Sequence, residues 1–241
     1  MSYIGVFIIV GLLIFAHELG HFLAARLVGL PIARFSLGMG RALWSRQIGA
    51  TEYRISLIPF GGYVLPEVVD ARTFFAQPVW RRLFFTLGGP LANFALAALG
   101  FAVFNVVLYG LSFEAVAVAP IQQTAQATLT VLRTVPMLLE GSSEVAGIVG
   151  VIAEGGDFVG SSGLLALQFA IVMSINLGIL NLLPIPPLDG GKSLLCCAEW
   201  VFSGVQHLHL PLNLAGMLML FGYFGYATFL DLKRLLAFLL V

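Results

Sequence analysis

Four long apolar stretches divide the chain, at about residues 4–26, 83–110, 163–183 and 212–232. Each is long enough to cross a bilayer as a helix, since about 20 apolar residues span the hydrocarbon core. Hydrophobic residues make up 59% of the 241 positions and charged residues only 10%, a balance that excludes an ordinary soluble domain. The pattern predicts an α-helical polytopic membrane protein with about four transmembrane helices.

The basic residues predict how these helices are oriented. Most of them lie in or beside the first loop, residues 27–82: Arg26, Arg34, Arg41, Arg46, Arg54, Arg72, Arg81 and Arg82. Because cytoplasmic loops are rich in Lys and Arg, we expect this loop in the cytoplasm and the N-terminus outside. The loop at 112–162 is mainly acidic and is expected on the outer side. Lys233 and Arg234 would then also lie outside, which leaves three or five spans open as alternatives.

Three ionisable residues, His17, Glu18 and His21, interrupt the first apolar stretch. A charged group at the centre of a transmembrane helix costs about 2.5 to 3.5 kcal/mol on insertion scales, so such groups indicate function. His17 and His21 would share one helix face, at the spacing with which two imidazoles bind one zinc ion. Glu18 could take a proton from a water on the metal. The motif predicts a zinc hydrolase within the membrane; the alternative is two hydrogen-bonded packing histidines.

A third metal ligand has to come from elsewhere, since a catalytic zinc site normally has three protein ligands and a water. The candidate is Asp189, after the third apolar stretch, where Pro184, Pro186 and Pro187 prevent a continuing helix. Non-helical backbone near membrane depth is tolerated where it is packed in protein or lines a polar cavity. This break could turn Asp189 toward the metal; the alternative is that Asp189 caps the next helix.

The two long loops have patterns of their own. Residues 34–40 and 52–64 alternate partly between apolar and polar positions and end in Gly and Pro, which predicts a β-hairpin or small sheet after the first helix. Its edge could hold an unwound substrate by strand addition, or it could be an ordinary hairpin. Residues 121–139 mix polar and apolar positions and suggest a helix lying on the membrane surface.

The His-Glu-Leu-Gly-His motif at 17–21 and the Asn-Leu-Leu-Pro-Ile-Pro-Pro-Leu-Asp-Gly motif at 181–190 together resemble the site-2 proteases, which are zinc-dependent intramembrane metalloproteases. Residues 59–64 and 89–93 agree with this family. The chain most resembles the bacterial four-span group that cuts anti-sigma factors and remnant signal peptides. By this resemblance the zinc ligands would be His17, His21 and Asp189, the general base would be Glu18, and the residues that hold the substrate backbone would be Asn93 and Asn181.

The resemblance also implies a single intramembrane protease domain over residues 1–241, in a bacterial cytoplasmic membrane. Its cofactor would be zinc, and its partners the lipid bilayer and single-span membrane proteins that another protease has first trimmed. Members of the bacterial group usually carry one or two PDZ domains between the second and third spans. Residues 112–162 are too few for a PDZ domain, so access is expected to depend on the surface segment or on a separate protein.

Other classes of function find less support in the sequence. The net charge of zero and the absence of a basic stripe argue against nucleic acid as a partner. A zinc transporter would need polar ligands along several spans, and the later spans offer almost none. A catalytically silent family member that binds membrane proteins is the main alternative, although such a protein would be expected to lose Glu18 or a metal ligand. Several residues near the last span are expected to serve packing: His207, His209, Gly216, Gly222 and Gly225.

Overall fold

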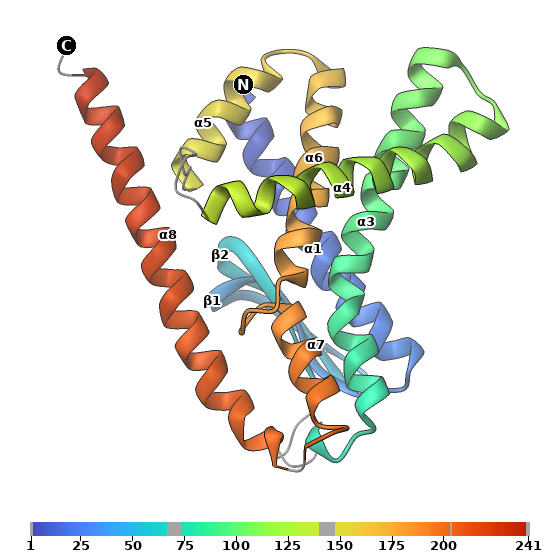
Figure 1. The fold of residues 1–241 in the computed structure, drawn as a ribbon, viewed down its shortest axis with the longest axis vertical. Coiled ribbons are helices and arrows are strands. Elements are labelled where there is room, and N and C mark those ends of the chain that lie inside the picture. The colour runs from blue at the N-terminus through green and yellow to red at the C-terminus, as the bar shows by residue number, and fades with distance from the viewer. Residues whose placement is uncertain (1, 67–73, 140–147, 203, 240–241) are drawn as a thin grey trace.

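A computed structural model of the protein describes residues 2–66, 74–139, 148–202 and 204–239 (Figure 1). Among these residues, four helices are long and apolar enough to cross a membrane: Tyr3–Leu27 in α1, Val79–Tyr109 in α3, Gly163–Leu182 in α6 and His209–Leu230 in α8. They agree with the four predicted stretches to within a few residues. Large apolar side chains stay exposed on these helices, among them Ile8, Leu99 and Phe221, as expected for surfaces that face lipid. The predicted helical, four-span fold is confirmed.

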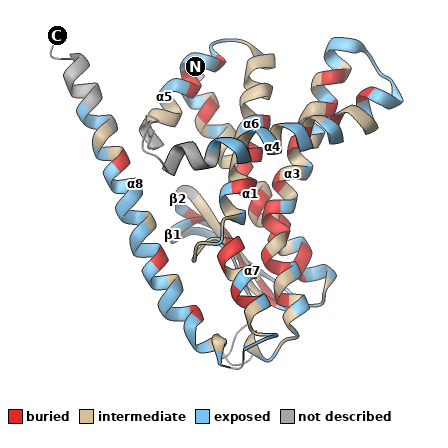
Figure 2. Cartoon of the chain, viewed as in Figure 1, coloured by how far each residue is buried: buried red, intermediate tan, exposed pale blue. Residues whose placement is uncertain are grey.

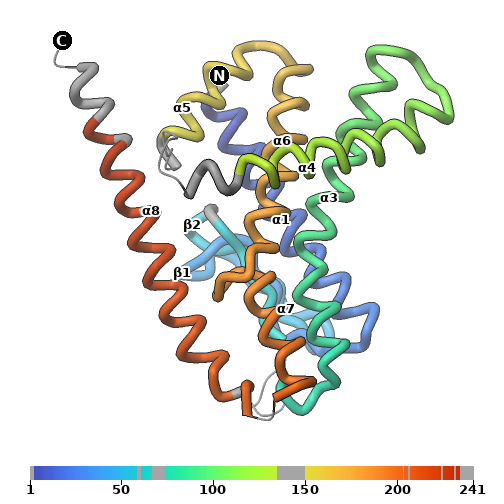
Figure 3. The backbone as a smooth tube through the Cα atoms, viewed as in Figure 1, coloured from blue at the N-terminus to red at the C-terminus, as the bar shows by residue number. Residues whose placement is uncertain are grey.

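The bundle is built from α1 (Ser2–Leu27), α3 (Val79–Tyr109) and α6 (Gly163–Leu182), which lie side by side (Figures 1 and 3). The contact between α3 and α6 is an apolar cluster of Ala97, Ile171, Ile175 and Ile179, all less than 4% exposed. Helix α6 begins at Ser162, whose side chain accepts a hydrogen bond from the Leu165 N–H, as an N-cap residue does. Buried residues are concentrated where the three helices meet (Figure 2).

The predicted sheet is present and its strands are longer than the sequence indicated. Strand β1 (Ile32–Ile48) and strand β2 (Thr51–Pro66) pair antiparallel and are joined by a tight turn at Gly49, where φ is +62°. Residues 34–37 of β1 pair with both 52–55 and 62–65, so β2 bends back and its last part reaches α1. The end of β1 near the turn is exposed, including the apolar Leu43, Trp44 and Ile48, and its burial does not alternate, because pairing rather than burial holds it.

The segment between α3 and α6 contains more helix than was predicted. A π-helical turn, η1 (Glu114–Val118), leads into α4 (Ala119–Leu139), which covers the expected helix at 121–139 and runs crosswise to α3 and α6 (Figure 1). Helix α5 (Ile148–Val159) was not predicted; it packs on α1 through Gly155 and Gly156, where an added Cβ would lie 3.3 Å from Val6 and 2.1 Å from Tyr3. The position of α4 on the membrane surface stays a prediction.

Helix α8 (His209–Leu239) lies along one side of the molecule, and most of its surface is exposed (Figures 1 and 2). Its start is fixed by ion pairs with the end of α7 (Asp189–Ala198) and the start of α3. His209 Nε2 lies 2.7 Å from Glu199 Oε1. Arg82 donates to both oxygens of Glu199, from Nη1 to Oε1 at 2.9 Å and from Nη2 to Oε2 at 2.5 Å. His209 thus has a structural role, through an ion pair rather than the packing contact that was expected. Of the three glycines predicted to allow close contact, only Gly216 does so, against Pro186; open space surrounds the other two.

Replacing Arg82 by alanine is expected to lower the free energy of unfolding by about 3 kcal/mol, because the largely buried Glu199 carboxylate would lose the partner that binds both its oxygens and keep only His209. Arg82 is 1% exposed. Burial would raise the pKa of Glu199, but the bonds from Arg82 and His209 outweigh it and lower the pKa, so the stabilisation is lost as the pH falls. Thermal unfolding measures the loss. Arg46→Ala, at an exposed site, is the control; equal melting temperatures of the two variants would contradict the prediction.

Candidate metal centre

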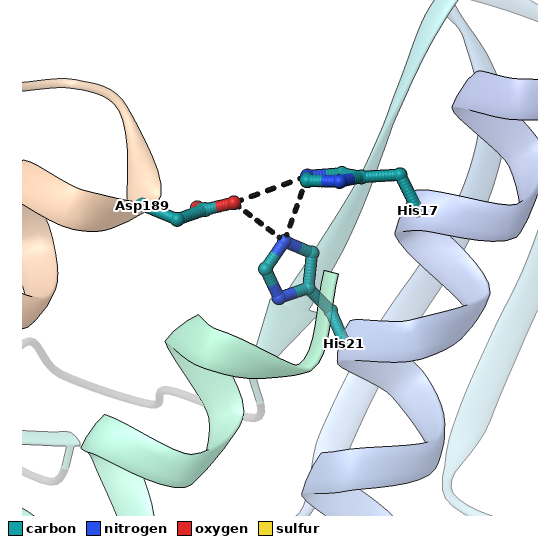
Figure 4. A group of neighbouring side chains, drawn as sticks. All are labelled: His17, His21 and Asp189. Atoms are coloured by element: carbon teal, nitrogen blue, oxygen red, sulfur yellow. Dashed lines mark hydrogen bonds and ion pairs between the residues drawn. The ribbon is translucent and has the colours of Figure 1, made fainter. Parts of the chain in front are cut away.

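Two histidines of α1 and the first residue of α7 meet inside the bundle. Figure 4 shows His17, His21 and Asp189 pointing toward one another. Asp189 Oδ2 lies 3.0 Å from each Nε2 atom, and the two Nε2 atoms are 3.2 Å apart. Two ligands of a tetrahedral zinc ion lie about 3.3 to 3.6 Å apart when the metal bonds are 2.0 to 2.2 Å, so these distances are close to those of a zinc site. Among the described residues this is the one cluster of three such side chains that could hold a metal ion.

The neighbours of His21 leave its Nε2 atom free for a metal. Its Nδ1 lies 2.8 Å from the carbonyl oxygen of Phe85 on α3 and donates to it. A histidine that donates from Nδ1 carries its lone pair on Nε2, and such a partner is the usual support of a metal ligand. Gly89 N–H, the helical donor to the Phe85 carbonyl, lies 3.3 Å from the same Nδ1 atom of His21, and Pro90, which has no N–H, leaves the neighbouring Thr86 carbonyl without its helical donor, so α3 is interrupted at this point.

Asn93 has the corresponding place beside His17. Its amide nitrogen lies 3.0 Å from His17 Nδ1, while its Oδ1 is buried without a partner among the described residues. Amide nitrogen and oxygen are assigned from such contacts, and the opposite orientation lets His17 Nδ1 donate to Oδ1. His17 Nε2 is then free for a metal, as in His21. The orphaned buried amide atom therefore fits an imidazole that binds a metal through Nε2.

The break after α6 brings Asp189 to the histidines. Helix α6 ends at Leu182, and α7 begins at Asp189 after the prolines. A Cβ added at Gly190 would lie 2.1 Å from the Leu182 oxygen, so only glycine lets the first turn of α7 pack back on the end of α6. Lys192, one turn later, binds Asp189 Oδ1 at 3.2 Å and leaves Oδ2 to face the histidines.

Close contact between α1 and α3 sets the position of the histidine pair. A Cβ at Gly20 would lie 2.3 Å from the Gly88 oxygen, and one at Gly88 would lie 2.6 Å from the Gly20 oxygen. Small residues of this kind let helix backbones approach closely in membranes. One residue further, Gly89 faces both imidazoles, so the backbone of α3 forms a wall of the metal centre.

Glu18 lies against the returning part of β2. A Cβ added at Gly62 would be 2.8 Å from Glu18 Cγ, so the strand passes directly over this half-buried side chain. The carboxylate follows His17 in the chain and lies at the same level of the bundle as the three ligand candidates. The fold thus combines a metal-ligand set, a carboxylate and a strand in one place.

Asn181 is placed differently from Asn93. Its Nδ2 donates to the Leu177 oxygen at 3.0 Å, one turn back on α6, and the side chain is half-buried. Three contributors were not singled out from the sequence: the Phe85 carbonyl, the Gly62 contact and Lys192. The spacing of Lys192 three residues after Asp189 on a helix was a signal for the last of these. The other two depend on contacts between distant segments.

Replacing Asn93 by alanine is expected to weaken zinc binding by about 10- to 100-fold, because His17 loses the partner that orients its ring. Asn181→Ala is the matched control: the Asn181 amide bonds its own helix, so zinc affinity should stay unchanged. Zinc affinity is measured by competition with a coloured chelator. Equal zinc affinity of the two variants would show that Asn93 does not position His17.

The comparison with known protein families agrees with this centre. The profile of peptidase family M50 matches residues 5–223, which include every residue of the site. The chain belongs to peptidase family M50. This is the family of the site-2 proteases, so the resemblance in the sequence is confirmed.

Several M50 relatives are similar to this chain over part of their length. A protein of Chlamydia pneumoniae named as a zinc metalloprotease is 40% identical over 110 residues, 39% of this chain and 18% of the relative. The regulator of sigma E protease of Haemophilus influenzae is 40% identical over 119 residues, 45% of this chain and 26% of the relative. The chain thus matches about a fifth to a quarter of the length of these relatives.

A third relative aligns with almost the whole chain. A Campylobacter jejuni protein named as a zinc metalloprotease is 23% identical over 347 residues, which cover 98% of this chain and 94% of the relative. The alignment is longer than the 241 residues of this chain, so the relative contains residues that this chain lacks. The relatives' names agree with zinc as the metal for the His17, His21 and Asp189 group.

Proposed function

We propose that this M50 protein is a zinc-dependent endopeptidase that hydrolyses peptide bonds within or near the transmembrane segments of membrane proteins. The observation that carries the proposal is the buried group of His17, His21 and Asp189, whose ligand atoms are spaced as in a zinc site, on a helix that can span a membrane. Glu18 adjoins this group. Two imidazoles, one carboxylate and an open fourth position are typical of a catalytic rather than a structural zinc site.

The chemistry divides between the metal ligands and Glu18. A zinc ion held by His17, His21 and Asp189 would supply Lewis acidity to the scissile carbonyl and the attacking water. Glu18 accepts the proton of that water and passes it to the leaving amine, as a general base and then a general acid. Phe85, Asn93 and Lys192 keep the three ligand side chains oriented through their hydrogen bonds.

A helical substrate has to be unwound before its backbone can react, because its amides are bonded within the helix. The last part of β2 passes Glu18 and can pair with an extended segment by strand addition. Asn93, oriented with Oδ1 on His17, keeps its NH₂ group for a substrate carbonyl. Asn181 is the second candidate, through its Oδ1. Substrates with helix-weakening residues near the cut are therefore favoured.

The family supports our proposal for the substrates and the membrane. One relative is named a regulator of sigma E protease, which supports single-span substrates of the anti-sigma factor or remnant signal peptide type, first trimmed by another protease. The basic first loop supports a bacterial cytoplasmic membrane with that loop in the cytoplasm and the N-terminus outside. Residues 1–241 would act as one protease domain, with access depending on α4 or on a separate protein.

The test is cleavage of a purified single-span substrate by the purified protein in detergent or liposomes. We expect cleavage that a chelator abolishes and that stoichiometric zinc restores. Unchanged cleavage after removal of the metal would contradict the zinc mechanism. Absence of cleavage across a panel of single-span substrates, with one zinc bound per chain, would favour a silent scaffold that binds membrane proteins instead.

A further inference from the structure

A cavity of about 440 Å³ lies beside the metal centre and has no part in the chemistry above. It is bounded by the end of β2, the start of α3, the middle of α7 and the first turns of α8. Val64, Phe75 and Phe85 make part of its apolar wall, while Lys192 and Asn213 contribute polar groups. Cavities with a largely apolar lining and a few placed polar groups are typical of binding sites.

The cavity shares two residues with the support of the metal ligands. Phe85, whose carbonyl binds His21, has its ring centroid 5.4 Å from that of His21. Lys192, which binds Asp189, lies in another wall. Val64 follows Gly62, which contacts Glu18, by two residues on the same strand. A peptide extended along β2 at the metal centre therefore passes the cavity.

One polar atom of the cavity wall lacks a partner. Asn213 Oδ1 is buried and receives no hydrogen bond from any residue that the structure describes. Buried acceptors are nearly always satisfied, so an orphan in a cavity wall points to a donor that arrives with a ligand. A backbone N–H of an unwound substrate is such a donor, because unwinding breaks its bond within the helix.

The walls are held in place by contacts of their own. The Arg82, Glu199 and His209 ion pairs fix the start of α8 to α7 and α3, and the His209 ring lies 5.0 Å from the Phe75 ring. Two turns along α8, Gly216 abuts the Pro186 carbonyl. Both contacts flank Asn213 in the chain, so the cavity is preformed and can select among substrates by shape.

We propose that this cavity binds one bulky apolar side chain of the substrate next to the scissile bond, and that Asn213 accepts a hydrogen bond from the substrate backbone there. The proposal rests on the proposed function and names a specificity determinant of that same site. It places a substrate contact on α8, outside the motifs that carry the metal ligands and the general base.

Cross-linking tests the placement without requiring cleavage. Asn213→Cys is combined with Cys196→Ala and Cys197→Ala, which remove the native thiol of the cavity wall and the exposed native thiol, and with Glu18→Gln. Single cysteines are then scanned along a single-span substrate, and disulfides are formed with copper phenanthroline. We expect cross-links from position 213 at one or two neighbouring substrate positions beside the cut. Leu218→Cys, at a 75% exposed site on the same helix, is the control. No cross-link, or the same diffuse pattern as the control, overturns the proposal.

Side-chain preference tests the specificity. At the cross-linked position, wild-type protein should cleave a Leu or Phe substrate about tenfold or more faster, as kcat/KM, than an Ala substrate. Asn213→Phe, which fills the cavity, should abolish or reverse this preference, and Asn213→Ala should raise KM about three- to tenfold. Leu218→Phe should behave as wild type. An unchanged preference in Asn213→Phe overturns the proposal. Absence of cleavage by the wild type counts against the proposed function. In that case the cross-links still test whether the substrate binds in the cavity.

Discussion

Glu18→Gln is expected to lower the cleavage rate by about 10² to 10⁴-fold and to leave zinc bound. The amide keeps the size of the side chain and its contact with Gly62, but it cannot accept the proton of the attacking water. The three ligand side chains and their partners are unaffected, so the metal should stay in place. Single-turnover cleavage of a model substrate and metal analysis of the same preparation measure the two quantities.

The matched control for this prediction is Glu154→Gln, which makes the same change at an exposed carboxylate on α5. It should cleave as the wild type does. If Glu18→Gln instead retained its rate, the general base would have to be another group. If it lost zinc together with activity, Glu18 would be a ligand or a support of the metal rather than the base.

Gly89→Ala is expected to weaken zinc binding by about a hundredfold or more and to abolish cleavage. The added Cβ would lie 2.4 Å from His21 Nε2 and 2.6 Å from His17 Cε1, so it would overlap sterically with both imidazole rings. Neither ring can move aside without leaving its partner on α3, the Phe85 carbonyl for His21 and the Asn93 amide for His17. Loss of a single partner of a metal ligand already costs about 10- to 100-fold in affinity.

Helix stability does not explain this effect, because alanine is a better helix former than glycine. Gly11→Ala on α1, where nothing lies within 4 Å of the added Cβ, is the control and should keep zinc and activity. Zinc affinity, cleavage and thermal unfolding are compared in both variants. Normal zinc affinity in Gly89→Ala would mean that α3 does not approach the histidines as closely as the structure has it.

The local features of this protein could be predicted from its sequence. Spans 20 to 31 residues long need only an apolar run, and the spacing of His17 and His21 on one face follows from the helix repeat. The hairpin and the helix at 121–139 were predicted as well, although the strand ends were not, because their pairing partners rather than their own alternation hold them. Helix α5 lacked a signal strong enough to predict it.

The sequence by itself determined the membrane class, the four spans and the histidine pair with its neighbouring carboxylate. All of these depend on residues within one or two helical turns, or on the cost of burying polar groups in lipid. Only the tertiary structure decided that Asp189, 168 residues beyond His21, lies 3.0 Å from it, that Phe85 and Asn93 orient the imidazoles, and that β2 covers Glu18. These contacts depend on how closely α1, α3 and α7 approach one another. Glycines at the helix crossings permit this close approach, and packing along the whole chain determines it.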